Sequence, residues 1–479
     1  MSSSAIQWDA ASPTGWTIGM LQLSAAAALL QTEYSGADRF ISGVSSDSRA
    51  IQAGDLFIAL RGPNFDWHDF VPSALAAGAA AAMVERGYAN ALLAAGLPLL
   101  VVDDCRLALG RLAALWRGRF DLPLIALTGS NGKTTVKEML AAILRAELTP
   151  GAGAQVASYD GSVLATRGNL NNDIGVPLTL LRLRDHHRFA VIEMGMNRRG
   201  EIGYLSSLAR PTIALVLNAQ RAHLEGLHDL ASVAQAKGEI LSGLGTGGCA
   251  VINADDQFAA LWRTLAAPHR VLEFGAGGTV QAHSRSTPSG SELHLVTPIG
   301  ESDCLLRVAG QHNVTNAAAA AAAAVAAGVS LHAISTGLSA FEGVPGRLQL
   351  RRGRNGACVI DDSYNDNPDS MRAAIDVLAA YPGERVLIAG DMGEVGRDGD
   401  AFHAEIGSYA RQRGIDQLLA VGVAMRHAVA AFGPSARHFA ETEELIAAAE
   451  GLARRDATVL VKASRFMRLE RVVAALVEV

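Results

Sequence analysis

The segment at residues 126–136, ALTGSNGKTTV, combines glycine, lysine and threonine in the manner of a phosphate-binding loop. In the usual form, G-x-x-x-x-G-K-[ST], the first glycine would fall at position 127. Leu127 stands there instead, and the first glycine of the segment is Gly129. An apolar run precedes the segment and a helical pattern follows it, which is the strand, loop and helix order of a phosphate site. A plain strand-to-helix turn is the alternative interpretation.

The residue types of this loop predict a site for ATP or GTP. Backbone N–H groups of a glycine-rich turn can point at phosphate oxygens, and the helix N-terminus adds positive potential. Lys133 would neutralise the β- and γ-phosphates, and the Thr134 hydroxyl would coordinate Mg²⁺. The residues expected to contact the nucleotide are Gly129, Ser130, Asn131, Gly132, Lys133, Thr134 and Thr135.

Three further side chains with possible metal or ligand chemistry follow later apolar runs. Glu193 ends one such run, where a carboxylate beside the loop could hold Mg²⁺, although a glutamate after a strand is also often simply solvated. His223 follows another run, at the sheet edge where open α/β folds bind ligands. Lys237 comes on the next helical pattern and, considered alone, indicates only a surface charge.

Two polar clusters predict recognition of a polar ligand. Asn313 and Asn316 open an alanine-rich helical segment and are three residues apart, so they would face the same way. Capping of the helix N-terminus explains one asparagine but not two. Residues 361–370, DDSYNDNPDS, place many amide and carboxylate groups between an expected strand and an expected helix.

Hydrophobic patterning divides the chain into three α/β blocks, which we place at residues 15–120, 121–345 and 346–479. A chain of 479 residues is too long for one ordinary hydrophobic core. In the middle block, continuous apolar runs alternate with helical patterns, which predicts a parallel sheet covered by helices on both faces. Alternating segments between about residues 270 and 310 predict a few antiparallel strands added to that sheet.

Individual elements can be placed within these blocks. In the first block we expect short strands, such as one at residues 54–60. The strands expected in the other two blocks are residues 122–127, 189–192, 212–217, 249–252, 358–360, 385–389, 417–421 and 458–461. The helices expected along the chain are residues 72–82, 106–118, 134–146, 316–327 and 468–479.

Charge and cysteine content narrow the class of protein. The net charge of −6 gives no electrostatic reason to expect nucleic acid or an anionic membrane as a partner. Cys105, Cys249, Cys304 and Cys358 lack C-x-x-C spacing, so we expect buried, reduced thiols. The N-terminal sequence does not resemble a signal peptide, and no apolar run is long enough to span a bilayer, so a cytoplasmic protein is expected.

Taken together, these motifs resemble those of the Mur ligases, the ATP-dependent amide ligases of bacterial cell-wall precursor synthesis. The segments that carry the resemblance are TGSNGKTT, RGNLNNDIGVPLTLL at residues 167–181, EMGMNRRGEI at residues 193–202, AHLEG, AKGEI and DDSYNDNPDSM. They extend over nearly the whole chain and are most similar to the family members that add D-alanyl-D-alanine. The resemblance implies a small mixed α/β domain for the UDP moiety, a central P-loop ATPase domain and a C-terminal Rossmann-like domain.

The resemblance also implies roles for individual residues. Lys133, Lys237 and His223 would be catalytic, and Thr134, Glu193, His223 and Lys237 would hold Mg²⁺, with Lys237 carried as a carbamate. Asn313 and Asn316 would bind adenine, and Arg347 and Asp362 would contact the ribose or phosphates of ATP. The residues implied for the other substrates are Ser46, Asp47, Ser48, Arg49 and His68 at the uridine end, together with Asn169, Asn171, Asn172, Asn365 and Asn367.

Two positions depart from the family pattern. The family segment is usually YNANP, and Asp366 replaces its alanine; VKGSR is expected near the C-terminus, and Ala463 replaces its glycine. A methyl group at residue 463 could narrow the approach of the backbone to a ligand. The family's ligand contacts therefore do not transfer directly to these two loops.

The implied reaction consumes ATP and joins UDP-N-acetylmuramoyl-tripeptide to D-alanyl-D-alanine through an acyl phosphate. We expect the protein to act as a monomer. Another amide ligase of the superfamily is an alternative, but one that adds a diamino acid would show a DNPR-like segment, and Asp369 stands at the arginine position. A folylpolyglutamate synthase and a P-loop protein that is not a ligase are further alternatives. The N-K-x-D motif with which GTPases read guanine does not occur in the chain.

Overall fold

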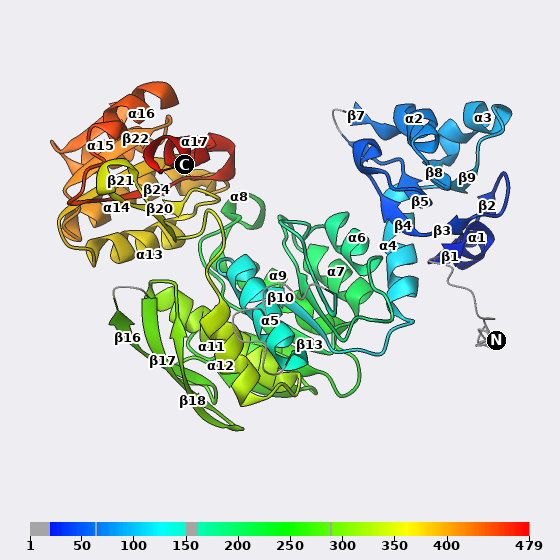
Figure 1. Ribbon diagram of the computed structural model, residues 1–479, viewed down its shortest axis with the longest axis horizontal. Coiled ribbons are helices and arrows are strands. Elements are labelled where there is room, and N and C mark those ends of the chain that lie inside the picture. The colour runs from blue at the N-terminus through cyan, green and yellow to red at the C-terminus, as the bar shows by residue number, and fades with distance from the viewer. Residues whose placement is uncertain (1–19, 63–64, 150–160, 288–289, 479) are drawn as a thin grey trace. The chain divides into compact units, whose positions relative to one another are not determined.

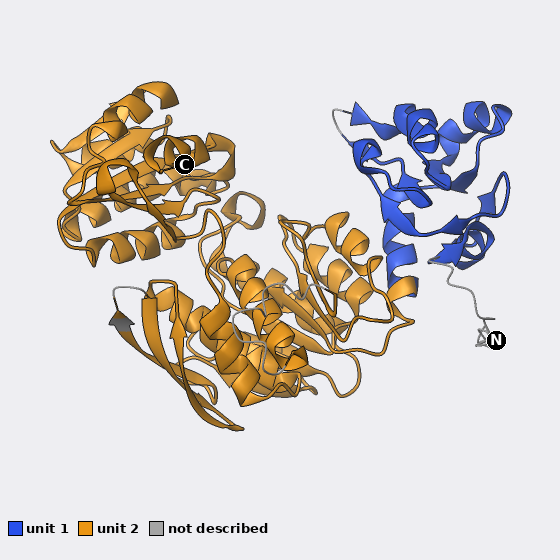
Figure 2. Cartoon of the chain, in the orientation of Figure 1, with its two compact units in different colours: residues 1–115 blue, residues 116–479 orange. Residues whose placement is uncertain are grey.

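The computed structural model describes residues 20–62, 65–149, 161–287 and 290–478, and it divides the chain into two compact units. The first unit ends at residue 115 and the second begins at residue 116 (Figure 2). Over the described ranges, no helix has both the length and the apolar character needed to cross a membrane.

The first unit is built on a five-stranded sheet with the order β2-β9-β8-β5-β4. Its strands are β2 (Glu33–Tyr34), β4 (Gly43–Ser45), β5 (Asp55–Ile58), β8 (Ala81–Glu85) and β9 (Leu99–Val102), and only β2 runs antiparallel to its neighbour. Its helices are α1 (Leu23–Leu30), α2 (Val71–Ala76), α3 (Arg86–Ala94) and α4 (Cys105–Arg117), the last of which continues into the second unit. Phe57, Val84 and Leu99 from the sheet pack with Val71 of α2 in a buried core.

The helix predicted at residues 72–82 is wrong in its second half. Alanine favours helix, but Gly78 adopts φ +110° after the end of α2, a conformation that ends a helix. Ala81 and Ala82 then enter β8 and pair with β5 and β9, fully buried between strands. Tertiary pairing therefore overrides the local propensity of this alanine-rich segment.

The second unit contains the predicted central parallel sheet, with the order β11-β12-β10-β13-β14-β15. Its strands are β10 (Leu124–Thr128), β11 (Val163–Ala165), β12 (Phe189–Glu193), β13 (Ile213–Val216), β14 (Cys249–Asn253) and β15 (Arg270–Phe274). All neighbouring pairs are parallel, so the carboxyl ends of these strands meet at one edge. The four strands predicted here are confirmed within a few residues of their expected limits.

Helices cover both faces of the central sheet. Helices α5 (Lys133–Leu148), α11 (Gln311–Ala326) and α12 (Leu331–Ala340) lie side by side over one face, while α7 (Glu201–Ala209) and α10 (Ala259–Ala266) contact the other (Figure 1). The alanines from Ala317 to Ala324 are almost fully buried. Their short side chains let α11 pack closely between the sheet and its neighbours, as the alanine run predicts.

The antiparallel strands expected near residues 270–310 exist but do not extend the parallel sheet. They form a separate three-stranded sheet of β16 (Gln281–Thr287), β17 (Gly290–Thr297) and β18 (Gly300–Leu306). Leu293 and Leu295 of β17 are buried and join the core that contains α11 and α12. The alternation correctly predicted strands with one buried face, but it carried no information about which sheet they join.

A second six-stranded sheet, with the order β19-β20-β24-β21-β22-β23, completes the second unit. Its strands are β19 (Gln349–Arg352), β20 (Cys358–Asp362), β21 (Glu384–Gly390), β22 (Gln417–Val421), β23 (Ala436–Phe439) and β24 (Ala457–Lys462). Its helices are α13 (Pro368–Ala379), α14 (Gly399–Gln412), α15 (Met425–Phe432), α16 (Thr442–Glu450) and α17 (Glu470–Leu476). Leu460 points into a core with α13, α14 and α15, whereas Val459 and Val461 point into a core with α16 and α17.

This arrangement gives the chain three α/β domains with separate cores, as the sequence predicts. The edge strands β19 and β23 were not predicted, because their charged sequences, QLRR and ARHF, do not form apolar runs. All four cysteines are free; Cys105 and Cys249 are buried as expected, but Cys304 and Cys358 are only partly buried.

Candidate active site

The loop between β10 and α5 has the geometry of a phosphate site, and it explains the displaced glycine. Leu127 is a fully buried strand residue of the central core, so a glycine there would leave a cavity. Gly129 lies where an added Cβ would come within 2.7 Å of Leu217 Cβ. Gly132 has φ +85°, and an added Cβ would lie 2.4 Å from Asn316 Oδ1. Glycine is therefore required at these two loop positions and not at position 127.

The loop is held from both sides by polar side chains. The Ser130 and Asn131 N–H groups donate to the Asn218 carbonyl and to Asn218 Oδ1, at 3.1 and 2.9 Å. Asn131 Nδ2 also donates to Gln220 Oε1, at 2.6 Å. From the C-terminal domain, Asn367 Nδ2 donates to Asn131 Oδ1 at 2.7 Å. Groups from two other segments of the chain thus hold the loop in place.

Asn367 also caps helix α13, so its removal should cost stability. Its Oδ1 accepts from the Ser370 N–H, and the Ser370 hydroxyl accepts from the Asn367 N–H. Loss of an N-cap typically costs about 1–2 kcal/mol. We expect Asn367→Ala to lower the free energy of unfolding by about that amount and to weaken nucleotide binding, since Asn131 loses a partner.

Chemical denaturation and nucleotide titration of the same preparations check this prediction. Ser330→Ala is the matched control, because Ser330 caps α12 through the Ala333 N–H without contacting the loop. It should lose comparable stability and bind nucleotide normally. Equal effects of both substitutions on binding would contradict the link between Asn367 and the loop.

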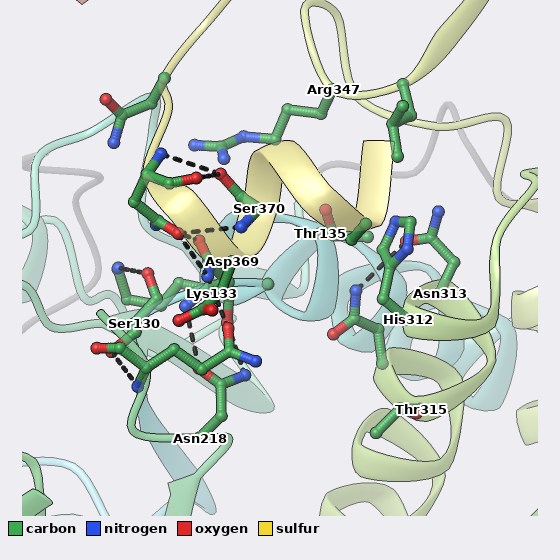
Figure 3. A pocket seen from close by; sticks show the side chains of 18 of the residues that line it. Ser130, Lys133, Thr135, Asn218, His312, Asn313, Thr315, Arg347, Asp369 and Ser370 are labelled. Atoms are coloured by element: carbon green, nitrogen blue, oxygen red, sulfur yellow. Dashed lines mark hydrogen bonds between the residues drawn. The ribbon is translucent and has the colours of Figure 1, made fainter. Parts of the chain in front are cut away.

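A polar cavity of about 330 Å³ lies in front of the loop (Figure 3). Lys133, Ser130 and Asn218 line one side of it, and His312 and Asn313 from the start of α11 line another. It brings together most of the residues predicted to bind the nucleotide, and also two predicted for the dipeptide. These lining residues are Ser130, Asn131, Gly132, Lys133, Thr135, Asn313, Asn316, Arg347, Asp362, Asn365 and Asn367.

Arg347 and Asp362 lie in a charged network at the rim of this cavity. Arg347 Nη2 donates to Thr134 Oγ1 at 3.2 Å, and its guanidinium stacks 4.4 Å from the centre of the Tyr364 ring. Asp362 Oδ2 forms an ion pair with Lys462 Nζ at 2.7 Å. Asn313 and Asn316 are linked to each other, with Asn316 Nδ2 3.2 Å from Asn313 Oδ1. This wall offers charged and amide groups to a nucleotide.

Glu193 ends β12 as predicted and is almost fully buried, at 1% exposure. Its Oε1 accepts from Asn171 Nδ2 at 2.8 Å, and its backbone N–H donates to Thr166 Oγ1 at 3.0 Å. Its Oε2 has no hydrogen-bond partner among the described residues. A buried, unpaired carboxylate oxygen is costly unless a cation binds it, so Glu193 fits a metal ligand.

Lys237 is fully buried on α9 (Leu230–Gly238), which overturns the simple prediction of a surface charge. Its Nζ has no hydrogen-bond partner in the described part of the chain. Burial, together with the charge of Lys133, holds the pKa of Lys237 well below its usual range. The charged ammonium form is therefore disfavoured at this position.

His223 adopts φ +58° just before α8 (Leu224–Leu227). Its Nδ1 lies 2.6 Å from Oε2 of Glu394, in the C-terminal domain, which leaves Nε2 as the other possible ligand atom. Burial lowers the pKa of His223, while Glu394 opposes that shift. No group of three or more His, Cys, Asp or Glu side chains suited to a metal occurs within the described ranges. Mg²⁺ commonly needs only one or two carboxylates, completed by phosphates and water.

A second contact joins the same segment to the C-terminal domain. Arg221 donates to Asp369 through Nε and Nη2, at 2.9 and 2.6 Å, and to Glu405 through Nη1, at 2.7 Å. Arg372 adds a bond to Glu405 at 3.0 Å. Paired guanidinium–carboxylate bonds are directional, so this network holds the start of α13 beside the segment that supports the loop.

The residues predicted for the uridine end belong to the first unit. Asp47 caps a short 3₁₀ helix at Ser48–Ala50 through the Arg49 N–H, and Arg49 is exposed and paired with Asp47 at 2.8 Å. His68 is buried, with Nδ1 2.6 Å from Asp66 and Nε2 accepting from the Glu85 N–H. Both ring nitrogens are engaged inside the unit, so His68 is suited to position its neighbours. Ser46 and Ser48 are partly buried in this segment.

The remaining predicted residues have diverse surroundings. Asn169 and Asn172 are exposed, and Asn172 Oδ1 accepts from the Gly175 N–H at 2.8 Å. Asn365 is exposed, and its carbonyl accepts from Lys462 Nζ at 2.9 Å. Ala463 is fully buried in a core of the C-terminal domain, with its methyl group beside Gly390. The extra methyl group at this position therefore packs in the core and does not lie on a surface that could contact a ligand.

Sequence reasoning assigned no role to several groups that complete the site. Asn218 and Gln220 hold the loop, His312 lines the cavity, and Lys462 balances the carboxylate of Asp362. Asn218 and Gln220 stand in the post-strand segment already singled out for His223, so that position was an available signal. Lys462 ends a strand far along the chain, and no local pattern connects it with Asp362.

A phosphate-binding loop at the start of a helix, a polar cavity in front of it and buried ionisable groups beside it define a P-loop enzyme. Comparisons with known proteins identify its family. Residues 40–117 match the Mur ligase family catalytic domain, residues 127–324 the Mur ligase middle domain, and residues 346–465 the Mur ligase glutamate ligase domain.

Individual relatives are similar to this chain over almost its full length. The UDP-N-acetylmuramoyl-tripeptide–D-alanyl-D-alanine ligase of Escherichia coli (strain K12) is 44% identical over 94% of this chain and 97% of its own length. The crystal structure of MurF from Acinetobacter baumannii is 37% identical, with a TM-score of 0.85 over 94% of this chain and 97% of that chain. MurF ligase from Thermotoga maritima in complex with ADP is 25% identical, with a TM-score of 0.77 over 90% and 96% of the two chains. The chain belongs to the Mur ligase family and is an ATP-dependent ligase that forms amide bonds.

Proposed function

We propose that this protein joins D-alanyl-D-alanine to UDP-N-acetylmuramoyl-tripeptide, acting as a monomer in the cytoplasm. The product would be the UDP-N-acetylmuramoyl-pentapeptide precursor of peptidoglycan. The observation that carries the proposal is 44% identity, over 94% of the chain, to the Escherichia coli ligase named for these two substrates. The residues that line the cavity supply the chemistry that such a reaction needs.

The reaction must first activate a carboxylate, which is a poor electrophile. The γ-phosphoryl group of ATP would pass to the tripeptide carboxylate and form an acyl phosphate, with ADP released. The free amine of the dipeptide would then attack the acyl carbon, and phosphate would leave with formation of the amide. Phosphoryl transfer depends mainly on positioning and charge neutralisation, which Lys133 in the cavity wall would supply.

We further propose that Thr134, Glu193, His223 and Lys237 hold Mg²⁺, which would neutralise phosphate charge. The unpaired oxygen of Glu193 supports this proposal. A neutral Lys237 amine can add to carbon dioxide and release a proton, which yields an anionic carbamate. Its burial and unpaired Nζ support that conversion, because a carboxylate-like group would supply the anion that a buried cation needs.

The remaining residue assignments are proposals of the same kind. Asn313, Asn316, Arg347 and Asp362 would contact the adenosine part of ATP, and Ser46, Asp47, Ser48, Arg49 and His68 would organise the uridine end. Asn169, Asn171, Asn172, Asn365 and Asn367 would serve the tripeptide and the dipeptide, although the contacts of Asn367 favour a role at the phosphate loop. We propose domain limits at residues 15–120, 121–345 and 346–479, of which residues 15–19, 63–64, 150–160, 288–289 and 479 lie outside the described ranges.

Phosphate release tests the proposal directly. The full protein is incubated with ATP, Mg²⁺, UDP-N-acetylmuramoyl-tripeptide and D-alanyl-D-alanine, and each component is omitted in turn. We expect release only when all are present, with a pentapeptide product identified by mass. Release with another amine in place of the dipeptide would keep the ligase and reject this substrate. Release that needs neither peptide would reject the ligase reaction.

A further inference from the structure

Asp366 places an additional carboxyl group in the wall of the nucleotide cavity. It stands where the Mur ligase segment usually has alanine, so the family pattern gives it no role. The side chain is buried, and its Oδ1 accepts from the Ser370 hydroxyl at 3.1 Å. Its Oδ2 has no hydrogen-bond partner among the residues that the structure describes.

An ionised Asp366 would have no close ion-pair partner of its own. The neighbouring ammonium group, Lys462 Nζ, lies 3.6 Å from Asp366 Oδ1 but only 2.7 Å from Asp362 Oδ2. Two carboxylates therefore share one lysine. His312 and Arg347 lie near this lysine and Asp362. Burial lowers the pKa of His312 to about 4, so it is neutral. Arg347 keeps its positive charge, but its described contacts are with the Thr134 hydroxyl and the Tyr364 ring and not with Asp366.

A nucleotide brings several negative charges into this cavity, next to a carboxylate that has only a distant share of Lys462. Like charges in a partly buried site repel strongly, and the repulsion disappears when one carboxylate gains a proton. The neutral carboxyl group also acquires an O–H donor. We propose that Asp366 is a nucleotide-binding residue of this protein, and that binding of a nucleoside di- or triphosphate is coupled to uptake of one proton by its side chain.

The ionisation of Asp366 is compatible with this coupling near neutral pH. Burial raises the pKa of Asp366 to about 7; Lys462 opposes the shift and Asp362 adds to it. Bound phosphate would raise the pKa further. Affinity should therefore be highest below the pKa of the free protein and fall by up to about tenfold for each pH unit above it, until the pKa of the complex is passed.

The inference rests on the proposed function of this cavity as a nucleotide site. Calorimetry with ADP on the full protein tests both nucleotide binding and its coupling to proton uptake. Titrations from pH 7.0 to 8.5 are run in buffers of different ionisation enthalpy, which report protons taken up on binding. We expect wild-type protein to take up a substantial fraction of one proton and to lose about five- to tenfold in affinity over this range. Asp366→Asn and Asp366→Ala should take up no proton on binding, and their affinities for ADP should change little between pH 7.0 and 8.5.

Asp376→Asn is the control for a carboxylate further along α13, since Asp376 pairs with Arg413 and does not line the cavity, and it should keep the wild-type proton uptake. Thermal unfolding of each variant shows whether it is folded, and Asp366→Asn preserves the shape of the side chain because an amide and a carboxylate are nearly isosteric. Wild-type binding without proton uptake, or equal uptake by Asp366→Asn, would overturn the coupling. Absence of ADP binding by the wild type would instead refute the nucleotide assignment and the inference with it.

Discussion

Replacement of Lys237 by methionine is expected to lower turnover by at least about 10²–10³-fold while leaving the protein folded. The expected loss follows from removal of the anion that a carbamate would place beside the phosphates. Stability should not suffer, because the buried Nζ has no described partner and an apolar side chain of similar length leaves no polar atom unpaired. Phosphate release and thermal unfolding, measured on the same preparations, separate the two effects.

Lys237→Arg is the second variant, because arginine keeps a long nitrogen-containing side chain but cannot form the carbamate. It should be as inactive as Lys237→Met. A carbamate signal in ¹³C NMR after incubation with labelled carbon dioxide is expected for the wild type and absent from both variants. Near-normal turnover of Lys237→Arg would contradict the proposed modification.

The lowered pKa of Lys237 has a consequence for stability. The unfolded chain binds a proton at this lysine below about pH 10, whereas the folded protein does not bind it until a much lower pH. Stability therefore rises with pH across this window, since the unfolded state holds more protons. Lys237→Met should flatten that dependence, which denaturant titrations at several pH values would measure.

The elements that the sequence predicts best are those in which burial gives every residue the same apolar character. The inner strands β10, β12, β13 and β14 are continuous apolar runs because helices cover both of their faces. Edge strands such as β19 lack this signature, since fewer of their side chains are buried. In β8, alanine fits both a helix and a buried strand, and pairing with β5 decides between them.

The site likewise contains some residues that a local motif predicts and others that only the fold brings together. The phosphate loop is a contiguous motif, so its glycines, Lys133 and Thr134 can be recognised directly. Lys237 has no local signature, and in the sequence only the family resemblance points to it. The bonds from Asn131 to Asn367 and from His223 to Glu394 join residues far apart in the chain, and no periodicity encodes them.

Lys133→Met is expected to reduce turnover by about 10³-fold, because the lysine would offset the repulsion between the γ-phosphate and the attacking carboxylate. Two unit charges 4 Å apart interact by about 4 kcal/mol at an effective dielectric constant of 20, which corresponds to about three orders of magnitude in rate. Lys133 Nζ donates to the carbonyls of Gly129 and Ser130, at 2.8 and 3.3 Å, so it already lies against the loop. Single-turnover phosphoryl transfer with saturating substrates measures the loss without a contribution from substrate binding.

Lys137 provides the control for removing a lysine from the same helix. It lies one turn further along α5, fully buried, and its Nζ donates to the Thr166 carbonyl at 2.8 Å and pairs with Glu138. Lys137→Met should cost about 1–3 kcal/mol of stability, because that carbonyl and carboxylate lose their partner, yet turnover of the folded protein should stay within a few-fold of wild type. If Lys137→Met lost as much phosphoryl transfer as Lys133→Met, the effect would come from damage to α5. A large loss confined to Lys133→Met would instead locate charge neutralisation at the phosphate loop.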